Sequence, residues 1–542
     1  MSKSRSKKLR RTFRTGKMAT NLRLLPRLLS LIAALLTVAA IGVSAEARPL
    51  TTTGRMPVNE MPSWFPKVPC AEAWGGKDLA RYDHKTDIEI KDGVGNVGYS
   101  KYQNRLKAKG IDRKSCYKDW AVLVFMSADN DLSPYAMWDL HEMEGPWLRE
   151  APMSGSTLRS DLLVQLDSEG ATGIRRVHVF QRPGTNYRVP LSKDEFTSLS
   201  PAQGIKSPIV QYFDEPAGGQ KEYKKRFREF LEWGVREYPA RHYFVITWGH
   251  GKGWTTADER NLTTADLADV LDDTTKITLE NTRPIDIVAA DSCLMQTIEV
   301  ANEVSSSARY VIGSAQVQTF LGLPYRQLMY QINSGYFLKA QGTVNSKDEP
   351  YLVARTIPTL VEKAVDPKRG AHRADPKAIE TFTISSLSSA AVKQQLVPSL
   401  NRLGKALQDY SKDHFMNMAD LTQIIDETQG FQGGAKEVGV FVGKLQVMLQ
   451  RVINEKGQLT PAGEKLRKAC DDVKSALSQA SLSYALGTNY KTELLPILGF
   501  KSVGIWIPRS QDEFQFGIDS FGSSKLYKGS DWEKWVRALY EF

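Results

Sequence analysis

The sequence predicts an α/β fold, in which a mostly parallel sheet lies between layers of helices. Its apolar, β-prone runs are continuous, which is typical of strands that are buried on both faces in a parallel sheet. Helical patterns follow most of these runs, and strands that alternate with helices give layered α/β folds. The chain has 542 residues, of which 41% are hydrophobic and 25% charged. It is therefore long enough for two or three domains with large cores.

The predicted core, residues 116–345, supplies most of the sheet. The expected strands are Trp120–Met126, Asp161–Leu166, an edge-like Arg176–Phe180, Tyr243–Trp248, Ile285–Asp291 and Tyr310–Ser314. The expected helices are Met137–Met143, Tyr223–Glu237 and Leu294–Val304. A long loop is expected between the fourth and fifth of these strands.

The character of the chain changes after about residue 345, where helical patterns dominate. The expected helices there are Pro350–Ala364, Ala390–Tyr410, Ala435–Asn454 and Pro461–Ser481. Two short runs, Glu380–Ile384 and Ser502–Pro508, read as strands. The second of these runs is compatible with the main sheet or with a smaller one. We therefore divide the chain into 116–345, the α/β core, and 346–542, a mainly helical region with a late strand near 502–508.

The N-terminal segment concentrates the positive charge of the chain. Residues 1–45 hold ten Lys and Arg and no acidic residue, whereas the net charge of the whole chain is +11. The near-neutral remainder argues against a nucleic-acid partner. The basic segment leads into an apolar run, Leu28–Val43, that is shorter than the roughly 20 residues of a membrane-spanning helix, and small residues follow it. Residues 1–47 are thus interpreted as a signal peptide, or alternatively as an uncleaved membrane anchor.

Export would place the mature protein in the periplasm or outside the cell, where disulfides form. Residues 48–115 are rich in Pro, Gly and charge, and we interpret them as an irregular N-terminal extension or a pro-segment. Cys70 and Cys116 bracket most of it, and a disulfide between them is one of two equal alternatives. Cys470 falls in a helical pattern and is expected to be a buried apolar residue. No cysteine spacing resembles a zinc site.

Two of the apolar runs end at reactive side chains. The run from Tyr243 leads to His250 and Gly251, and the run from Ile285 leads to Cys293. Because functional groups of parallel sheets gather at the carboxyl ends of the strands, this pair would place an imidazole beside a thiol, as a cysteine nucleophile with a histidine base requires. A helix that begins at Cys293 would lower the pKa of the thiol. The backbone N–H groups of Gly251 and Cys293 are the candidate oxyanion donors.

Asp291 lies two residues before Cys293. Alternation along a strand lets both side chains reach the same side of the sheet rim. The carboxylate would attract a basic side chain of a substrate, or would instead bind backbone donors of the following helix. The residues alone leave these two roles equal.

Three stretches resemble the clostripain family of cysteine peptidases, which belongs to one larger group with caspases, gingipains, legumains and separases. They are Trp120–Leu132 followed by Asp139–Met143, then Trp248–Trp254, which contains His250, and finally Asp291–Ala301, which contains Cys293. Gly499–Pro508 is similar to a late strand of that family. The resemblance implies a caspase-like three-layer core and endopeptidase activity after Arg or Lys. It also implies a His250–Cys293 dyad and a role for Asp291 in selecting the basic residue.

The resemblance further implies self-cleavage between the two motifs, for which Lys276, Arg260 and Arg283 are the candidates, with Lys276 slightly favoured. Two positions depart from the family pattern: Gly249 replaces the usual Asn, and Gly313–Pro324 lacks the usual acidic residues. No cofactor is expected to be required. Calcium stays open, since some relatives respond to it, although the scattered acids Asp269, Asp272 and Asp273 form no ligand array.

The function predicted from the sequence is an exported cysteine endopeptidase whose partners are proteins or peptides with basic residues. No nucleic acid is expected to bind, and membrane contact is expected only through an uncleaved N-terminal segment. Two alternatives remain. One is a catalytically weak or inactive binding protein with a caspase fold, which the altered subsites favour. The other is a transpeptidase or amidase that uses the same dyad.

Overall fold

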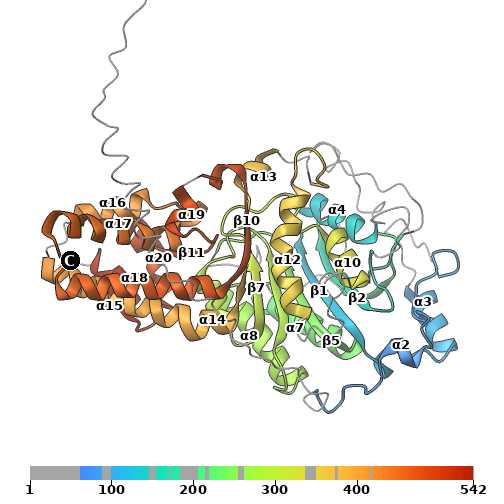
Figure 1. Ribbon diagram of the computed structural model, residues 1–542. Coiled ribbons are helices and arrows are strands. Elements are labelled where there is room, and N and C mark those ends of the chain that lie inside the picture. Colours follow the sequence, from blue (N-terminus) through green and yellow to red (C-terminus); the bar gives the residue numbers. More distant parts are fainter. Residues whose placement is uncertain are drawn as a thin grey trace, which may run out of the picture. The chain divides into compact units, whose positions relative to one another are not determined.

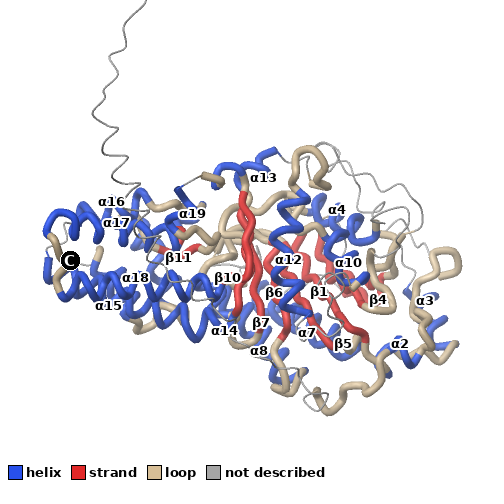
Figure 2. The backbone as a smooth tube through the Cα atoms, viewed as in Figure 1, coloured by secondary structure: helices blue, strands red, loops and turns tan. Residues whose placement is uncertain are grey.

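A central sheet organises the described part of the protein (Figures 1 and 2). In this computed structural model its order is β10-β8-β7-β6-β5-β1-β2-β3-β4. The described residues are 61–87, 99–145, 154–169, 173–182, 205–213, 219–253, 262–335, 349–372, 376–414, 418–492 and 494–540. The predicted signal peptide, 1–47, lies outside them. The strands are β1 (Lys118–Ala128), β2 (Ser160–Ser168), β3 (Ile174–His178), β4 (Ile209–Phe213), β5 (Ala240–Trp248), β6 (Ile285–Asp291), β7 (Ala308–Gly313), β8 (Thr383–Ser388) and β10 (Ser481–Leu486).

The five central strands, β7-β6-β5-β1-β2, are parallel to one another. β3 and β4 extend one edge and β8 and β10 the other, all through antiparallel pairing. The predicted α/β class with a mostly parallel sheet is therefore confirmed. β4 and β10 are strands that the sequence patterns did not reveal, and β3 is an inner strand, because β4 lies beyond it.

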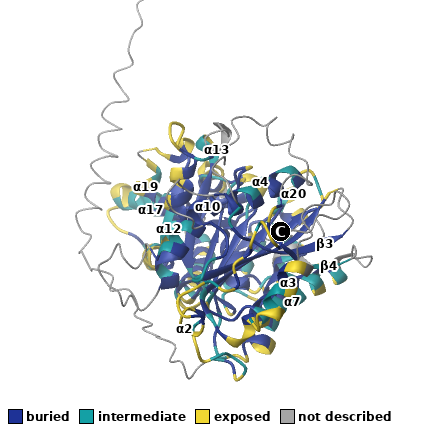
Figure 3. Ribbon diagram, turned by 90° about the vertical axis from the view of Figure 1, so that its right-hand side faces the viewer, coloured by how far each residue is buried: buried dark blue, intermediate teal, exposed yellow. Residues whose placement is uncertain are grey.

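Helices cover both faces of the sheet. Val122, Val124 and Met126 of β1 pack in one core with α4 (Ser133–Glu144), α10 (Tyr325–Ser334) and α12 (Glu349–Ala364). Leu123 and Phe125 point the other way and pack in a second core with α7 (Gly219–Glu237), α8 (Thr264–Asp273) and α9 (Ile298–Glu303). Burial on both faces explains why the strand sequences are continuously apolar. Figure 3 shows this buried centre in dark blue.

The chain after residue 345 shares this architecture. β8 and β10 come from that region, so the main sheet extends past the boundary suggested by the sequence. Helices from this region pack on the second core, among them α15 (Val397–His414), α17 (Val438–Lys456), α18 (Pro461–Ala480) and α21 (Asp531–Ala538). The late strand β11 (Gly504–Trp506) pairs with β9 (Ala435–Glu437) in a separate two-stranded sheet. The remaining helices are α2 (Cys70–Ala73), α3 (Tyr99–Ala108), α13 (Pro376–Thr381), α14 (Ser389–Ala391), α16 (Met418–Glu427), α19 (Leu494–Leu498) and α20 (Gln511–Gly522).

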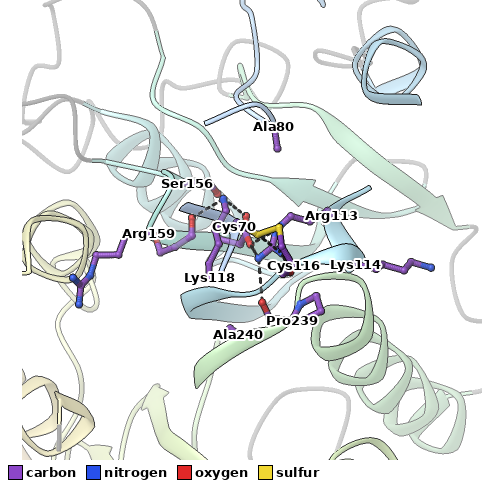
Figure 4. Close-up of polar contacts among 12 residues, drawn as sticks. Cys70, Ala80, Arg113, Lys114, Cys116, Lys118, Ser156, Arg159, Pro239 and Ala240 are labelled. Carbon is purple, nitrogen blue, oxygen red and sulfur yellow. Dashed lines mark hydrogen bonds and ion pairs between the residues drawn. A yellow bond between two sulfur atoms is a disulfide. The ribbon is translucent and has the colours of Figure 1, made fainter. Parts of the chain in front are cut away.

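A disulfide attaches the N-terminal extension to the amino ends of the strands (Figure 4). Cys70 and Cys116 are bonded, which settles the alternative left open by the sequence. Beside them, the Arg113 guanidinium donates to the Cys116 carbonyl oxygen at 2.7 Å and to the Pro239 carbonyl oxygen at 3.2 Å. Arg113 and Lys118 both form ion pairs with the buried Asp161. The extension is thus fixed to the sheet at the edge where β1 and β5 begin.

Cys470 is fully buried, as expected for a small apolar residue. Within the described ranges, we find no helix with both the length and the apolar character needed to cross a bilayer.

Candidate active site

The strand ends that lead to His250 and Cys293 are neighbours. β5 ends at Trp248 and β6 ends at Asp291, and these two residues are paired in the parallel register. His250 and Cys293 each follow two residues later. A Cβ atom built on Gly251 would lie 2.2 Å from the Cys293 carbonyl oxygen, so the two loops are in contact. The structure therefore brings the histidine and cysteine motifs together at the carboxyl edge of the sheet.

Gly249, where the clostripain pattern has Asn, is explained by its backbone. Its φ of 142° lies in the region that favours glycine, and a Cβ atom there would lie 2.9 Å from the Ser127 carbonyl oxygen. The chain thus passes close to the end of β1 just before it reaches His250. The backbone conformation therefore explains why this position departs from the family pattern.

Asp131 holds the imidazole of His250. The Nε2 atom of His250 lies 2.8 Å from Oδ1 of Asp131, in the loop that follows β1. Asn130 fixes this loop, because its side chain accepts from the Leu132 N–H and donates to the Ser127 carbonyl oxygen. A carboxylate only accepts hydrogen bonds, so Nε2 carries the proton in this pair and, in a neutral imidazole, Nδ1 is the basic nitrogen.

The environment of the Cys293 thiol differs from the one that the sequence suggested. The residue is half-buried, and its Sγ accepts a hydrogen bond from the Gln318 N–H at 3.3 Å. The expected helix start at Cys293 is wrong: α9 begins at Ile298, with Thr297 as its N-cap. Burial, and to a smaller extent the charge of Asp291, raise the pKa of the thiol, while the Gln318 N–H opposes this effect. The sulfur therefore lacks the helix N-terminus that was expected to lower its pKa.

The loop after β7 binds the loop that contains Cys293 through backbone hydrogen bonds. The Leu294 N–H donates to the Gln316 carbonyl oxygen at 3.1 Å, and the Gln296 N–H donates to that of Ser314 at 3.0 Å. Leu294 has a φ of 65°, which is strained for a residue with a side chain. These bonds fix the backbone on the carboxyl side of Cys293. The Cys293 carbonyl oxygen lies in contact with Gly251.

Asp291 lies beneath this same loop. Its carboxylate is buried and accepts three hydrogen bonds: from the Leu323 N–H at 2.9 Å, from the Tyr325 hydroxyl at 2.7 Å and from the Gln318 side-chain amide at 3.1 Å. Burial raises the pKa of this carboxyl, which the three donors partly offset. The alternative expectation that Asp291 binds backbone donors of the following helix is wrong, because its partners come from the loop after β7 and from the start of α10.

The C-terminal region contacts α9 and the loop after β7. Buried Glu299 of α9 accepts from the Trp506 N–H at 2.9 Å and from the Tyr527 hydroxyl at 3.1 Å. The side chain of Gln316 donates to the Tyr490 hydroxyl at 2.9 Å and accepts from the Gln432 N–H at 3.2 Å. The position of the loop beside Cys293 therefore depends on residues more than a hundred positions away in the chain.

The self-cleavage candidates occupy different surroundings. Lys276 lies in a π-helical turn, Thr274–Thr278, that follows α8, and it forms an exposed ion pair with Asp272. Arg283 is buried and forms an ion pair with Asp286. Arg260 lies outside the described residues.

Within the described ranges, no three or more His, Cys, Asp or Glu side chains form a group that could hold a metal ion. The acids considered for calcium are taken up by other partners. Asp269 pairs with Lys224, Asp272 with Lys276, and Asp273 with Arg228.

Known proteins are similar to this chain in sequence pattern and in fold. Residues 124–345 match the sequence model of the clostripain family. An inactive zymogen of a C11 protease from Parabacteroides distasonis superposes with a TM-score of 0.50 at 17% identity, covering 76% of this chain and 98% of that one. A secreted C11 cysteine protease from Bacteroides thetaiotaomicron, solved with an irreversible peptide inhibitor, is also 17% identical, with a TM-score of 0.47 and coverages of 78% and 99%. No curated protein matches the chain.

The fold and the family match define a cysteine peptidase with a caspase-like core. The match of residues 124–345 to the clostripain family model confirms the resemblance that the motifs around His250 and Cys293 indicated.

The thiol environment predicts how alkylation of Cys293 depends on pH. Iodoacetamide reacts with the thiolate, and a raised pKa means that the thiolate forms only at higher pH. The alkylation rate should therefore still increase above pH 8.5, roughly the value of an ordinary cysteine. Cys293→Ser is the control that assigns the adduct by mass spectrometry, since Cys470 is buried. A plateau reached below pH 7 would contradict the proposed effect of burial.

Asp131 should act as a positioning residue for His250. Asp131→Ala removes the acceptor of the Nε2 hydrogen bond, and we expect kcat for peptide hydrolysis to fall by about tenfold with little change in KM. Asp131→Asn keeps an oxygen that accepts this bond and should retain more activity. Asp129→Ala, two residues earlier in the same loop, is the matched control. Equal kinetics for the two alanine variants would contradict the assignment.

Proposed function

We propose that this protein is an exported cysteine endopeptidase that cleaves after Arg or Lys through His250 and Cys293. In the first step the imidazole takes the thiol proton, and the sulfur attacks the carbonyl carbon of the scissile peptide bond. The imidazolium then protonates the amine as the C–N bond breaks, which leaves an acyl group on the sulfur. Water hydrolyses this thioester with the imidazole as base and restores the free thiol.

The observation that carries this proposal is that the two motifs follow paired residues at the ends of neighbouring parallel strands. Trp248 and Asp291 are register partners, and His250 and Cys293 follow each at the same spacing. Gly251 and Cys293 touch through their backbones. Their N–H groups are the proposed oxyanion donors, and the loss of one such donor typically costs about 3 kcal/mol of transition-state stabilisation.

The proposed preference for basic residues is supported by Asp291. Its carboxylate lies under the loop whose Gln318 N–H contacts the sulfur, so it is near the residue that the sulfur would attack. Its described partners are neutral donors. A basic side chain of the substrate would therefore bring the positive charge that this buried carboxylate lacks.

Two other functions remain as alternatives. An inactive binding protein with this fold would need neither the imidazole bond to Asp131 nor the contact between Gly251 and Cys293. A transpeptidase or amidase would use the same thioester but transfer the acyl group to an amine, or cleave a cell-wall amide. Product analysis separates these activities, because ligated products appear only for the transpeptidase.

The dyad is tested with fluorogenic peptides that carry Arg, Lys or a neutral residue before the scissile bond. Wild-type protein should cleave the Arg and Lys peptides, and Cys293→Ala and His250→Ala should each lower kcat/KM by at least about 1,000-fold. Thermal unfolding of each variant checks that it folds. Cleavage that persists in Cys293→Ala would refute the proposed nucleophile.

Self-processing between the motifs is proposed at Arg260. The two other candidates are less suited, because a protease binds an extended segment, whereas Lys276 lies in a helical turn and Arg283 in a buried ion pair. Intact mass should show cleavage after Arg260 in the wild type and a whole chain in Cys293→Ala. An active wild-type enzyme that stays in one piece, or that is cut after Lys276, would reject this site.

The proposed setting of the enzyme is outside the cytoplasm, in the periplasm or secreted. The Cys70–Cys116 disulfide supports it, because such bonds persist in oxidising compartments. The proposed partners are proteins and peptides with basic residues, not nucleic acid. Catalysis is proposed to need no cofactor, and equal activity in EDTA and in calcium would support this; strict dependence on calcium would contradict it.

A further inference from the structure

Buried acidic side chains gather behind Cys293. Asp291, Asp139 and Glu142 are 4%, 2% and 3% exposed. Asp139 accepts from the Trp248 indole N–H at 2.6 Å, and Glu142 lies 3.4 Å from the His372 ring. Among the described residues, no Lys or Arg forms an ion pair with Asp291 or Asp139. A buried carboxylate that has only neutral donors is a favourable site for an incoming cation.

Gln318 adds a buried acceptor to this group. Its Nε2 donates to Oδ1 of Asp291 at 3.1 Å, which fixes the orientation of the amide because a carboxylate can only accept. The carbonyl oxygen, Oε1, is buried and receives no hydrogen bond from any described residue. The whole residue is 9% exposed. A buried acceptor without a donor destabilises the folded state, so this oxygen has a strong preference for an N–H partner.

The position of Gln318 links this acceptor to the nucleophile. The backbone N–H of the same residue donates to Sγ of Cys293 at 3.3 Å. The Gln318 amide therefore lies within one side-chain length of the sulfur. A substrate residue whose carbonyl carbon meets the sulfur would have its own side chain in this neighbourhood.

Apolar side chains flank Gln318 at the surface. Val317 is 38% exposed and Phe320 is 46% exposed. The Phe320 ring stacks on Tyr135 with centroids 5.3 Å apart, so helix α4, which follows the Asp131 loop, holds it in place. Apolar surface beside a buried polar group suits a long basic side chain, whose aliphatic stem packs on the apolar part while its charged head binds the polar part.

We propose that Gln318 is a specificity-determining residue, whose Oε1 accepts an N–H of the Arg or Lys head group next to the Asp291 carboxylate, while the stem of that side chain packs on Val317 and Phe320. This inference rests on the proposed function. Both acceptors are covered, so entry of the side chain requires a local displacement of residues 317–321. That segment contains neither helix nor strand, and binding energy of the correct substrate can drive such a displacement.

The experiment compares two peptides that differ only in the residue before the scissile bond, Lys or norleucine, which is its uncharged analogue. Gln318→Met keeps the length of the side chain but removes both amide groups. We expect the ratio of kcat/KM for the Lys peptide to that for the norleucine peptide to fall by about 10- to 100-fold, as the loss of a hydrogen bond to a charged group predicts. Hydrolysis of the norleucine peptide should change little.

Gln423→Met is the matched control. The Gln423 side chain lies in α16 and donates to the exposed Glu427, so the ratio should stay near the wild-type value. Should Gln318→Met fail to unfold cooperatively, Gln318→Glu decides, because it retains an acceptor and should keep the ratio at or above the wild-type value.

The outcomes separate the proposals. An unchanged ratio in Gln318→Met, or a fall in Gln318→Glu, overturns the role of Gln318 and leaves the peptidase assignment intact. A higher ratio in Gln318→Met would show that the residue blocks the basic side chain, which also overturns this inference. A wild-type enzyme that prefers norleucine refutes the basic preference together with Gln318. Wild-type protein that cleaves neither peptide refutes the proposed endopeptidase.

Discussion

The parallel pairing of β5 with β6 is the constraint on which the site depends. Pairing Trp248 with Asp291 sets the ends of the two strands at one height, and the loops that leave them then meet through Gly251 and Cys293. A shift of register by one residue would turn each strand's side chains to the opposite faces of the sheet. Helices bury both faces of these strands, so the register is strongly specified. The reactive pair is thereby positioned by the most buried part of the molecule.

Three loops, each from a different strand end, contact the His250 and Cys293 motifs. The loop after β1 provides Asp131 for the imidazole, the loop after β5 provides Gly251, and the loop after β7 covers Asp291 and contacts Sγ through Gln318. The C-terminal region stabilises the last of these loops through Tyr490. That region therefore contacts the site through this loop, and it holds in place the loop that is proposed to bind the substrate side chain.

The electrostatics of the site are unusual for a cysteine nucleophile. Burial and a neighbouring carboxylate both work against the thiolate, and the short helix α9 begins too late to favour it. In the proposed mechanism, the imidazole of His250 therefore has to activate the sulfur. The described parts of the N-terminal extension lie elsewhere, at the amino ends of the strands, where Trp64 donates to the Thr278 carbonyl oxygen and Cys70 is bonded to Cys116. They stabilise the fold from the end opposite to the sulfur.

The sequence by itself determined the α/β class, the central strands and the pairing of the His250 and Cys293 motifs, because runs buried on both faces have a distinctive local pattern. It gave only equal odds for the Cys70–Cys116 disulfide, and it missed β4 and β10, which are short strands at the edges of the sheet. It also misplaced the start of α9, because Leu294 takes a left-handed conformation that no propensity predicts. Asp131 had a detectable signal, since it follows the strand next to β5. The contacts of Gln318 were decided by tertiary structure alone, because the loop after β7 has no periodic pattern and is placed by residues far away in the chain.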